Sequence, residues 1–166
     1  HAAADVSPTM HPDPDAMVTV SLDAITPWGY LALRNAARRS VALVIPRGGL
    51  FAAIRSHKHD EAPELPGGKV QEGESAYDAA KREGGEELGV PVDVDETPLG
   101  EFLHEYRGDW WLCTAYAASV GDARLVGSAE GDAVWEERAV LEASTYPGVT
   151  RRIFAAYDAR WAEAAK

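Results

Sequence analysis

The chain has 166 residues, of which 46% are hydrophobic and 26% are charged, and its net charge is −11. This length suits one domain with a single core, and the composition is that of a globular protein. No run of about 18 apolar residues occurs, which excludes a membrane-spanning helix. The negative charge argues against binding to duplex nucleic acid, and the single cysteine excludes a disulfide framework or a multi-cysteine zinc site.

The N-terminal segment contains two different patterns. Residues 1–17 are rich in Pro, Asp and Ala without apolar periodicity, which predicts a flexible tail. The chain as given opens without a secretory signal, so we expect a cytoplasmic protein. Residues 17–24 alternate apolar and polar side chains and predict a strand, with residues 30–34 as its hairpin partner across the turn residues Pro27 and Gly29.

The middle and end of the chain alternate strand and helix patterns. The apolar run 40–46 predicts a strand that is buried on both faces, and after the turn at 47–49 residues 50–55 predict a second strand. Further predicted elements are a helix over 75–88, strands over 99–106, 110–118 and 134–140, and an amphipathic terminal helix over 149–164. Mixed strands with these two helices predict helices on opposite faces of a β-core.

The helix predicted over 75–88 has clear start and stop signals. Ser75 and Asp78 fit a capping box, and Gly89 suits a left-handed helix end with Pro91 barring continuation. The side chains expected on its core side are Tyr77, Ala80, Gly84 and Leu88.

Three carboxylates lie on a neighbouring strip of this helix. Glu83, Glu86 and Glu87 stand at positions i, i+3 and i+4, where like charges disfavour the helix by a few tenths of a kcal/mol per pair. Such a strip is either a solvated acidic face or a set of hard oxygen ligands for Mg²⁺ or Mn²⁺. The preceding Gly67 and Gly68 favour the second interpretation, because their backbone can offer a carbonyl ligand or approach a phosphate closely.

Residues 68–90 resemble the box of the Nudix hydrolase family. The matching residues, in order, are Gly68, Glu74, Arg82-Glu83, Glu86-Glu87, Gly89 and Val90. With roughly 0.07 for each of seven fixed residues, chance agreement is on the order of 10⁻⁸ per window. The resemblance implies an α/β fold, specifically a Nudix-type α/β/α sandwich with a mixed sheet between helices, spanning residues 18–166. It also implies water attack on the diphosphate of a small nucleotide-type substrate.

The resemblance also implies roles for residues of the box. Glu83, Glu86 and Glu87 would be catalytic and would hold Mg²⁺, or Mn²⁺, together with the backbone carbonyl of Gly68. Glu74 and Arg82 would pair to brace the loop against the helix. Glu83 has two open roles, since it is either the base that activates water or a metal ligand alone.

One acidic residue outside the box is a further candidate. Glu130 lies in a glycine-flanked loop before Trp135, and Nudix hydrolases often add a ligand or base from such a loop. Its alternative is an exposed loop glutamate, and Glu136 or Glu137 compete for the role.

Basic and aromatic residues supply the remaining candidates. Arg55 ends a predicted strand in a position similar to a phosphate-contacting arginine of MutT-like members, and with Lys58 and Lys69 it would offset the global negative charge at the site. A transition-metal site at the histidines flanking Lys58 is disfavoured, because nearby carboxylates select hard ions. Trp110 and Trp111 must point to opposite faces of one strand; either both are core or one is free to stack on a base.

Three functions remain open at this point. The preferred one is a MutT-like nucleoside triphosphate pyrophosphohydrolase. An ADP-ribose or nucleotide-sugar pyrophosphatase is the alternative, supported by the predicted N-terminal hairpin, which in such enzymes often contributes to a homodimer. A non-catalytic nucleotide sensor is supported only by Gly84, which replaces the apolar residue of the box and leaves either a void or a space filled by a bulky neighbour such as a tryptophan.

Overall fold

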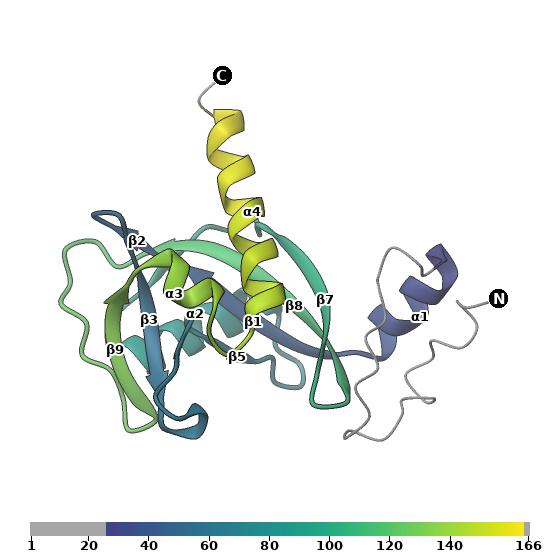
Figure 1. Cartoon of the computed structure of the whole chain (residues 1–166), viewed down its shortest axis with the longest axis horizontal. Coiled ribbons are helices and arrows are strands. Elements are labelled where there is room, and N and C mark those ends of the chain that lie inside the picture. The colour runs from purple at the N-terminus through teal and green to yellow at the C-terminus, as the bar shows by residue number, and fades with distance from the viewer. Residues whose placement is uncertain (1–25, 165–166) are drawn as a thin grey trace.

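The structure is a computed structural model that describes residues 26–164, so the predicted tail and the strand predicted over 17–24 lie outside the described residues. Its elements in chain order are α1 (Pro27–Ala36), β1 (Arg38–Val44), β2 (Pro46–Arg47), β3 (Leu50–Ser56), the 3₁₀ turn η4 (His57–His59), β4 (Pro63–Glu64), β5 (Gly67–Lys69), α2 (Ala76–Leu88), β6 (Asp93–Val94), β7 (Gly100–Tyr106), β8 (Asp109–Ser119), β9 (Gly131–Glu136), α3 (Arg138–Glu142) and α4 (Pro147–Ala164) (Figure 1). None of the helices within 26–164 is both long enough and apolar enough to cross a bilayer.

Two sheets form the centre of the fold. The five-stranded sheet has the order β5-β1-β8-β6, with β7 also paired to β8. Within it β1 runs parallel to β8 and antiparallel to β5, so the sheet is mixed. The second sheet is antiparallel, with β9 along one edge of β3 and with β2 and β4 paired to successive parts of its other edge.

Strand β1 separates two hydrophobic clusters, as the alternation of side chains in a strand requires. Val41 and Leu43 belong to the cluster that contains Ala79, Ala80 and Leu88 of α2. The intervening residues Ala42 and Val44 belong to the cluster that contains Ile153 and Phe154 of α4. Helices therefore cover opposite faces of the mixed sheet, and the predicted α/β/α sandwich is confirmed.

The strand predicted over 30–34 is wrong, because these residues lie within helix α1. Thr26 caps this helix, its Oγ1 accepting a hydrogen bond from the Gly29 N–H at 3.2 Å, and Pro27 suits the first helical turn. The helix is anchored by Leu33, which is fully buried in a cluster with Leu103, Trp110 and Leu112. In Figure 1, α1 lies at the end of the molecule opposite β3 and β9.

The strand predicted over 134–140 is only partly correct. Strand β9 spans Gly131–Glu136, and residues 138–140 belong to α3 instead. The strand begins at Gly131, where a Cβ would lie 2.5 Å from the carbonyl oxygen of Arg55, so the glycine permits this close backbone approach. The strands predicted over 40–46, 50–55, 99–106 and 110–118 and the helices predicted over 75–88 and 149–164 are confirmed within a few residues at their ends.

Helix α2 has the predicted ends but a different environment for Gly84. Ser75 Oγ accepts the Asp78 N–H at 3.0 Å, and Gly89 closes the helix at φ +71°. The Asp78 carboxylate does not complete the predicted capping box but lies 3.3 Å from Lys81 Nζ. A Cβ on Gly84 would lie 2.6 Å from a methyl group of Leu43, so leucine rather than tryptophan fills the space beside this glycine.

Candidate active site

A cavity of about 660 Å³ gathers most of the residues that the sequence singles out. Those of them that line it are Gly68, Lys69, Arg82, Glu83, Glu86, Glu87 and Glu130, with Lys58 as a further cation. They come from β5, from one side of α2, from η4 and from the loop before β9. The fold thus brings the glycine-rich loop, the acidic strip and the distant Glu130 to one hollow.

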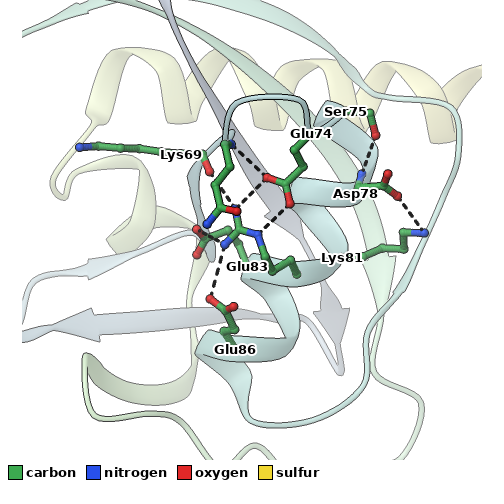
Figure 2. A network of polar contacts seen from close by, with 9 residues as sticks. Lys69, Glu74, Ser75, Asp78, Lys81, Glu83 and Glu86 are labelled. Atoms are coloured by element: carbon green, nitrogen blue, oxygen red, sulfur yellow. Dashed lines mark hydrogen bonds and ion pairs between the residues drawn. The ribbon is translucent and has the colours of Figure 1, made fainter.

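Arg82 joins the loop after β5 to helix α2. Its Nε and Nη2 donate to the two oxygens of Glu74 at 2.8 and 2.9 Å, and Nη2 also donates to the carbonyl oxygen of Lys69 at 3.0 Å. The guanidinium hydrogen bonds and the Gln71 N–H hold the pKa of Glu74 at about 2. Figure 2 shows Glu74, Glu83 and Lys69 gathered at this contact.

Glu83 and Glu86 approach the same guanidinium from α2. Arg82 Nη1 donates to Glu83 Oε1 at 2.9 Å and lies 3.5 Å from Glu86 Oε2. Glu83 packs so closely on Gly68 that any side chain at that position would overlap its carboxyl group. Burial raises the pKa of Glu83, and the carboxylates of Glu86 and Glu130 raise it further against the opposing effect of Arg82.

Glu87 is the most buried of the acidic residues in the box. It is 9% exposed, and its Oε1 accepts a hydrogen bond from the Gly67 N–H at 2.7 Å. Burial, followed by the carboxylates of Glu83, Glu64 and Glu130, raises its pKa to about 8. The charged form of Glu87 is therefore disfavoured unless a cation balances it.

The donor chemistry of this group fits a divalent cation. Mg²⁺ and Mn²⁺ prefer carboxylate and carbonyl oxygens, and the acidic residues here lie beside an accessible glycine backbone. Within the described part of the chain, no three acidic, His or Cys side chains stand together as a ligand set. In this arrangement Glu83 accepts a hydrogen bond from Arg82, and Glu87 accepts one from the Gly67 N–H.

Sequence reasoning missed a further carboxylate in the cavity wall. Glu64 Oε2 lies 2.8 Å from Nδ1 of His59, and both residues line the cavity. Burial raises the pKa of Glu64, while the His59 ring opposes that shift. The available signal was the position of Glu64 directly before the glycine-rich segment that opens the box, four residues ahead of Gly68.

The cavity is also lined by aromatic rings, most of which sequence reasoning missed. Tyr146 lies among these rings, with ring centroids 4.9 Å from Tyr106, 5.9 Å from His59 and 6.4 Å from His104. Burial and, to a lesser extent, Arg152 lower the pKa of His104 to about 4, so its ring is neutral at pH 7.

The tryptophan pair of β8 separates as strand geometry requires. Trp110 is 6% exposed and packs in the cluster of Leu33, whereas Trp111 lines the cavity. The Lys69 Nζ lies 5.9 Å from the Trp111 ring centroid. The structure therefore agrees with the interpretation in which Trp110 is a core residue and Trp111 faces the space where a ligand would bind.

Arg55 is not brought to the cavity. Its Nη2 donates to Glu136 Oε2 at 2.8 Å, across the β3–β9 pairing, and Nη1 donates to the carbonyl oxygen of Glu61 at 3.3 Å. Glu130, by contrast, lies in the cavity wall, and its carbonyl oxygen accepts the His57 N–H at 3.1 Å. Lys58 and Lys69, unlike Arg55, line the same cavity as the acidic group and Arg82.

Comparisons with known proteins agree with this geometry. The model of the NUDIX domain family matches residues 35–157, whereas none of the curated proteins matches. The solution structure of the E. coli ORF135 protein is 27% identical, covers 78% of this chain and 95% of that one, and superposes with a TM-score of 0.60.

Two further solved structures share the fold at lower identity. The MutT protein from Methanosarcina mazei Go1 is 21% identical over 75% of this chain and 94% of that one, with a TM-score of 0.62. The C. elegans Ap4A hydrolase in a binary complex is 21% identical over 74% of this chain and 98% of that one, with a TM-score of 0.60.

Proposed function

Because the chain belongs to the Nudix family of pyrophosphohydrolases, we propose that it cleaves nucleoside triphosphates to a mononucleotide and pyrophosphate. The observation that carries this proposal is the cavity itself. Four carboxylates from α2 and the loop before β9 line this cavity together with Lys58 and Lys69, and aromatic rings line it as well. Charged groups for phosphates and aromatic rings for a base match the two chemical halves of a nucleotide.

The proposal assigns the acidic group to Mg²⁺, or to Mn²⁺. Glu83, Glu86, Glu87 and Glu130 and the carbonyl of Gly68 would hold it. When bound, this cation supplies positive charge to the phosphoryl oxygens and acidifies water. The raised pKa of Glu87, caused first by burial and then by neighbouring carboxylates, supports the assignment, because a bound cation would stabilise the charged form of this side chain.

The chain's own residues bind and orient the substrate. Lys58 and Lys69 attract phosphates to a protein whose net charge is −11. Arg82 and Glu74 hold Lys69, at the end of β5, in place against α2. They therefore position other residues and do not contact the substrate themselves. Glu83, which accepts a hydrogen bond from Arg82, is proposed as a ligand of the cation.

The two alternatives have lost support. The N-terminal hairpin that favoured an ADP-ribose or nucleotide-sugar pyrophosphatase is not formed at 30–34, which lies in α1. A non-catalytic sensor rested on a void beside Gly84, and Leu43 fills that space. A cytoplasmic location, a homodimer and the boundary of the domain at residue 18 stay predictions.

A turnover screen tests the substrate. The purified chain with Mg²⁺ is given ATP, GTP, dATP, diadenosine tetraphosphate, ADP-ribose and UDP-glucose, and products are separated by chromatography. We expect a mononucleotide and pyrophosphate from a triphosphate. The matched control is Glu61→Gln, a carboxylate outside the cavity that should leave turnover unchanged. Release of AMP and ribose phosphate from ADP-ribose alone would replace the proposal with the first alternative.

A further inference from the structure

Two histidine–glutamate pairs follow strand β3, and only one of them faces the cavity. His57 Nδ1 lies 2.5 Å from Glu61 Oε1, with side chains that are 54% and 51% exposed. His59 Nδ1 lies 2.8 Å from Glu64 Oε2, with side chains that are only 21% and 15% exposed. Both members of the second pair line the cavity beside Glu83 and Glu87, so the pair is a built part of its wall.

The contact with Glu64 determines which nitrogen of a neutral His59 ring carries hydrogen. A carboxylate only accepts hydrogen bonds, so Nδ1 must donate, and Nε2 is left with its lone pair free. Glu64 is held by the pairing of β4 with β3, opposite Ile54, and the Tyr146 ring packs edge-on against His59. The imidazole is therefore oriented, and the Glu64 side chain lies beside it, where a carboxylate would stabilise the protonated ring.

The box carboxylates are already engaged in other contacts. Glu83 accepts a hydrogen bond from Arg82, and Glu87 accepts one from the Gly67 N–H. Both are also proposed as metal ligands, and a bound cation would favour their charged form and so lower their affinity for a proton. His59 belongs to neither set, and it lies on the same cavity.

We infer that His59, oriented by Glu64, accepts the proton of the water that attacks the phosphoric anhydride. An O–H bond of water breaks and its proton goes to Nε2, while the water oxygen forms a bond to phosphorus. The bond between that phosphorus and the bridging oxygen breaks, and its electron pair leaves on the bridging oxygen with the departing phosphate group. His59 then returns the proton to solvent. The inference rests on the proposed hydrolysis but not on which nucleotide is cleaved, and it makes Glu64 a positioning residue.

Kinetics of matched variants test the inference with the best substrate of the screen above. His59→Ala should lower kcat by about 100-fold or more with little change in KM, because a positioned base contributes on that scale. Added imidazole should restore part of the lost rate. The control is His57→Ala, which removes the exposed pair and should leave kcat unchanged. His59→Gln, which keeps the side chain polar, is measured beside His59→Ala, and thermal melting shows that each variant is folded.

A spectroscopic measurement tests the orientation without any substrate. Nitrogen-15 NMR of the wild-type chain should show His59 with hydrogen on Nδ1, and Glu64→Ala should abolish that preference. Hydrogen on Nε2 in the wild type would overturn the inference. So would an unchanged kcat in His59→Ala, or a loss confined to KM, which would make His59 a binding residue.

The kinetic outcomes also separate the two proposals. If the wild type cleaves another anhydride and His59→Ala loses kcat, the inference holds and the nucleoside triphosphate substrate is wrong. If the wild type and His59→Ala cleave triphosphates at the same rate, only the inference about His59 is wrong. If the wild type cleaves none of the compounds in the screen, both fail.

Discussion

Gly84 and Gly85 are consecutive in α2, but a methyl group added to each would meet very different surroundings. A Cβ on Gly84 would lie 2.6 Å from Leu43 Cδ1 and 3.3 Å from Val92 Cγ2. A Cβ on Gly85 would meet only the Val90 carbonyl oxygen, at 3.9 Å, which is ordinary contact. Leu43 has no exposed surface, so its methyl group cannot move out into solvent.

Gly84→Ala and Gly85→Ala should therefore change the free energy of unfolding by clearly different amounts. Replacing glycine by alanine inside a helix stabilises it by about 1 kcal/mol, and this gain is common to both. Overpacking a filled core costs about 1–3 kcal/mol, and only Gly84→Ala incurs it. We expect Gly85→Ala to stabilise the fold by about 1 kcal/mol, and Gly84→Ala to be about 1–3 kcal/mol less stable than Gly85→Ala.

Equilibrium denaturation in urea measures both changes in the free energy of unfolding. Leu43→Val supplies a further control, because valine lacks the methyl group that the new Cβ would meet. In a double-mutant cycle, Gly84→Ala should cost less beside Leu43→Val than it does alone. Equal stability of Gly84→Ala and Gly85→Ala would refute the reasoning, since it would mean that Leu43 shifts without cost.

Three further predictions concern the cavity. Glu86→Gln and Glu87→Gln should each lower turnover at least about 100-fold while the circular dichroism of the fold is preserved, and unchanged turnover would remove that residue from the site. Mg²⁺ should raise Tm by mass action, and less so in Glu87→Gln; a flat titration with activity intact would show that the metal arrives only with substrate. The pKa of His104 is about 4 in the folded chain, against an ordinary value of 6.5. Between pH 4 and pH 6.5 the unfolded chain therefore binds more protons at this residue than the folded chain does. The contribution of His104 to stability should therefore fall by about 1.4 kcal/mol per unit as pH drops through that window, while the raised pKa of Glu87 acts in the opposite direction in both the wild type and the variant. His104→Gln should lose this slope, and identical slopes in the two proteins would contradict the assignment.

Helix α2 was predictable because its signals are local. The cap at Ser75, the left-handed Gly89 and the spacing of the carboxylates all act within a few residues, and each holds in the structure. The same signals misled at α1, where Pro27 and Gly29 suit a turn as well as a first helical turn. Burial of Leu33 against Trp110, more than 70 residues away in the chain, decided in favour of the helix.

The sequence by itself determined the family, the α/β/α class and the acidic strip of α2, because these rest on short-range spacing and on the periods of helix and strand. Only the tertiary structure decided which distant side chains share the cavity. The pairing of β3 with β9 brings Glu136 to Arg55 and draws this arginine away from the site. The pairing of β3 with β4 places Glu64 beside His59. Contacts of this kind depend on strand neighbours and register, which no residue in a single short segment encodes.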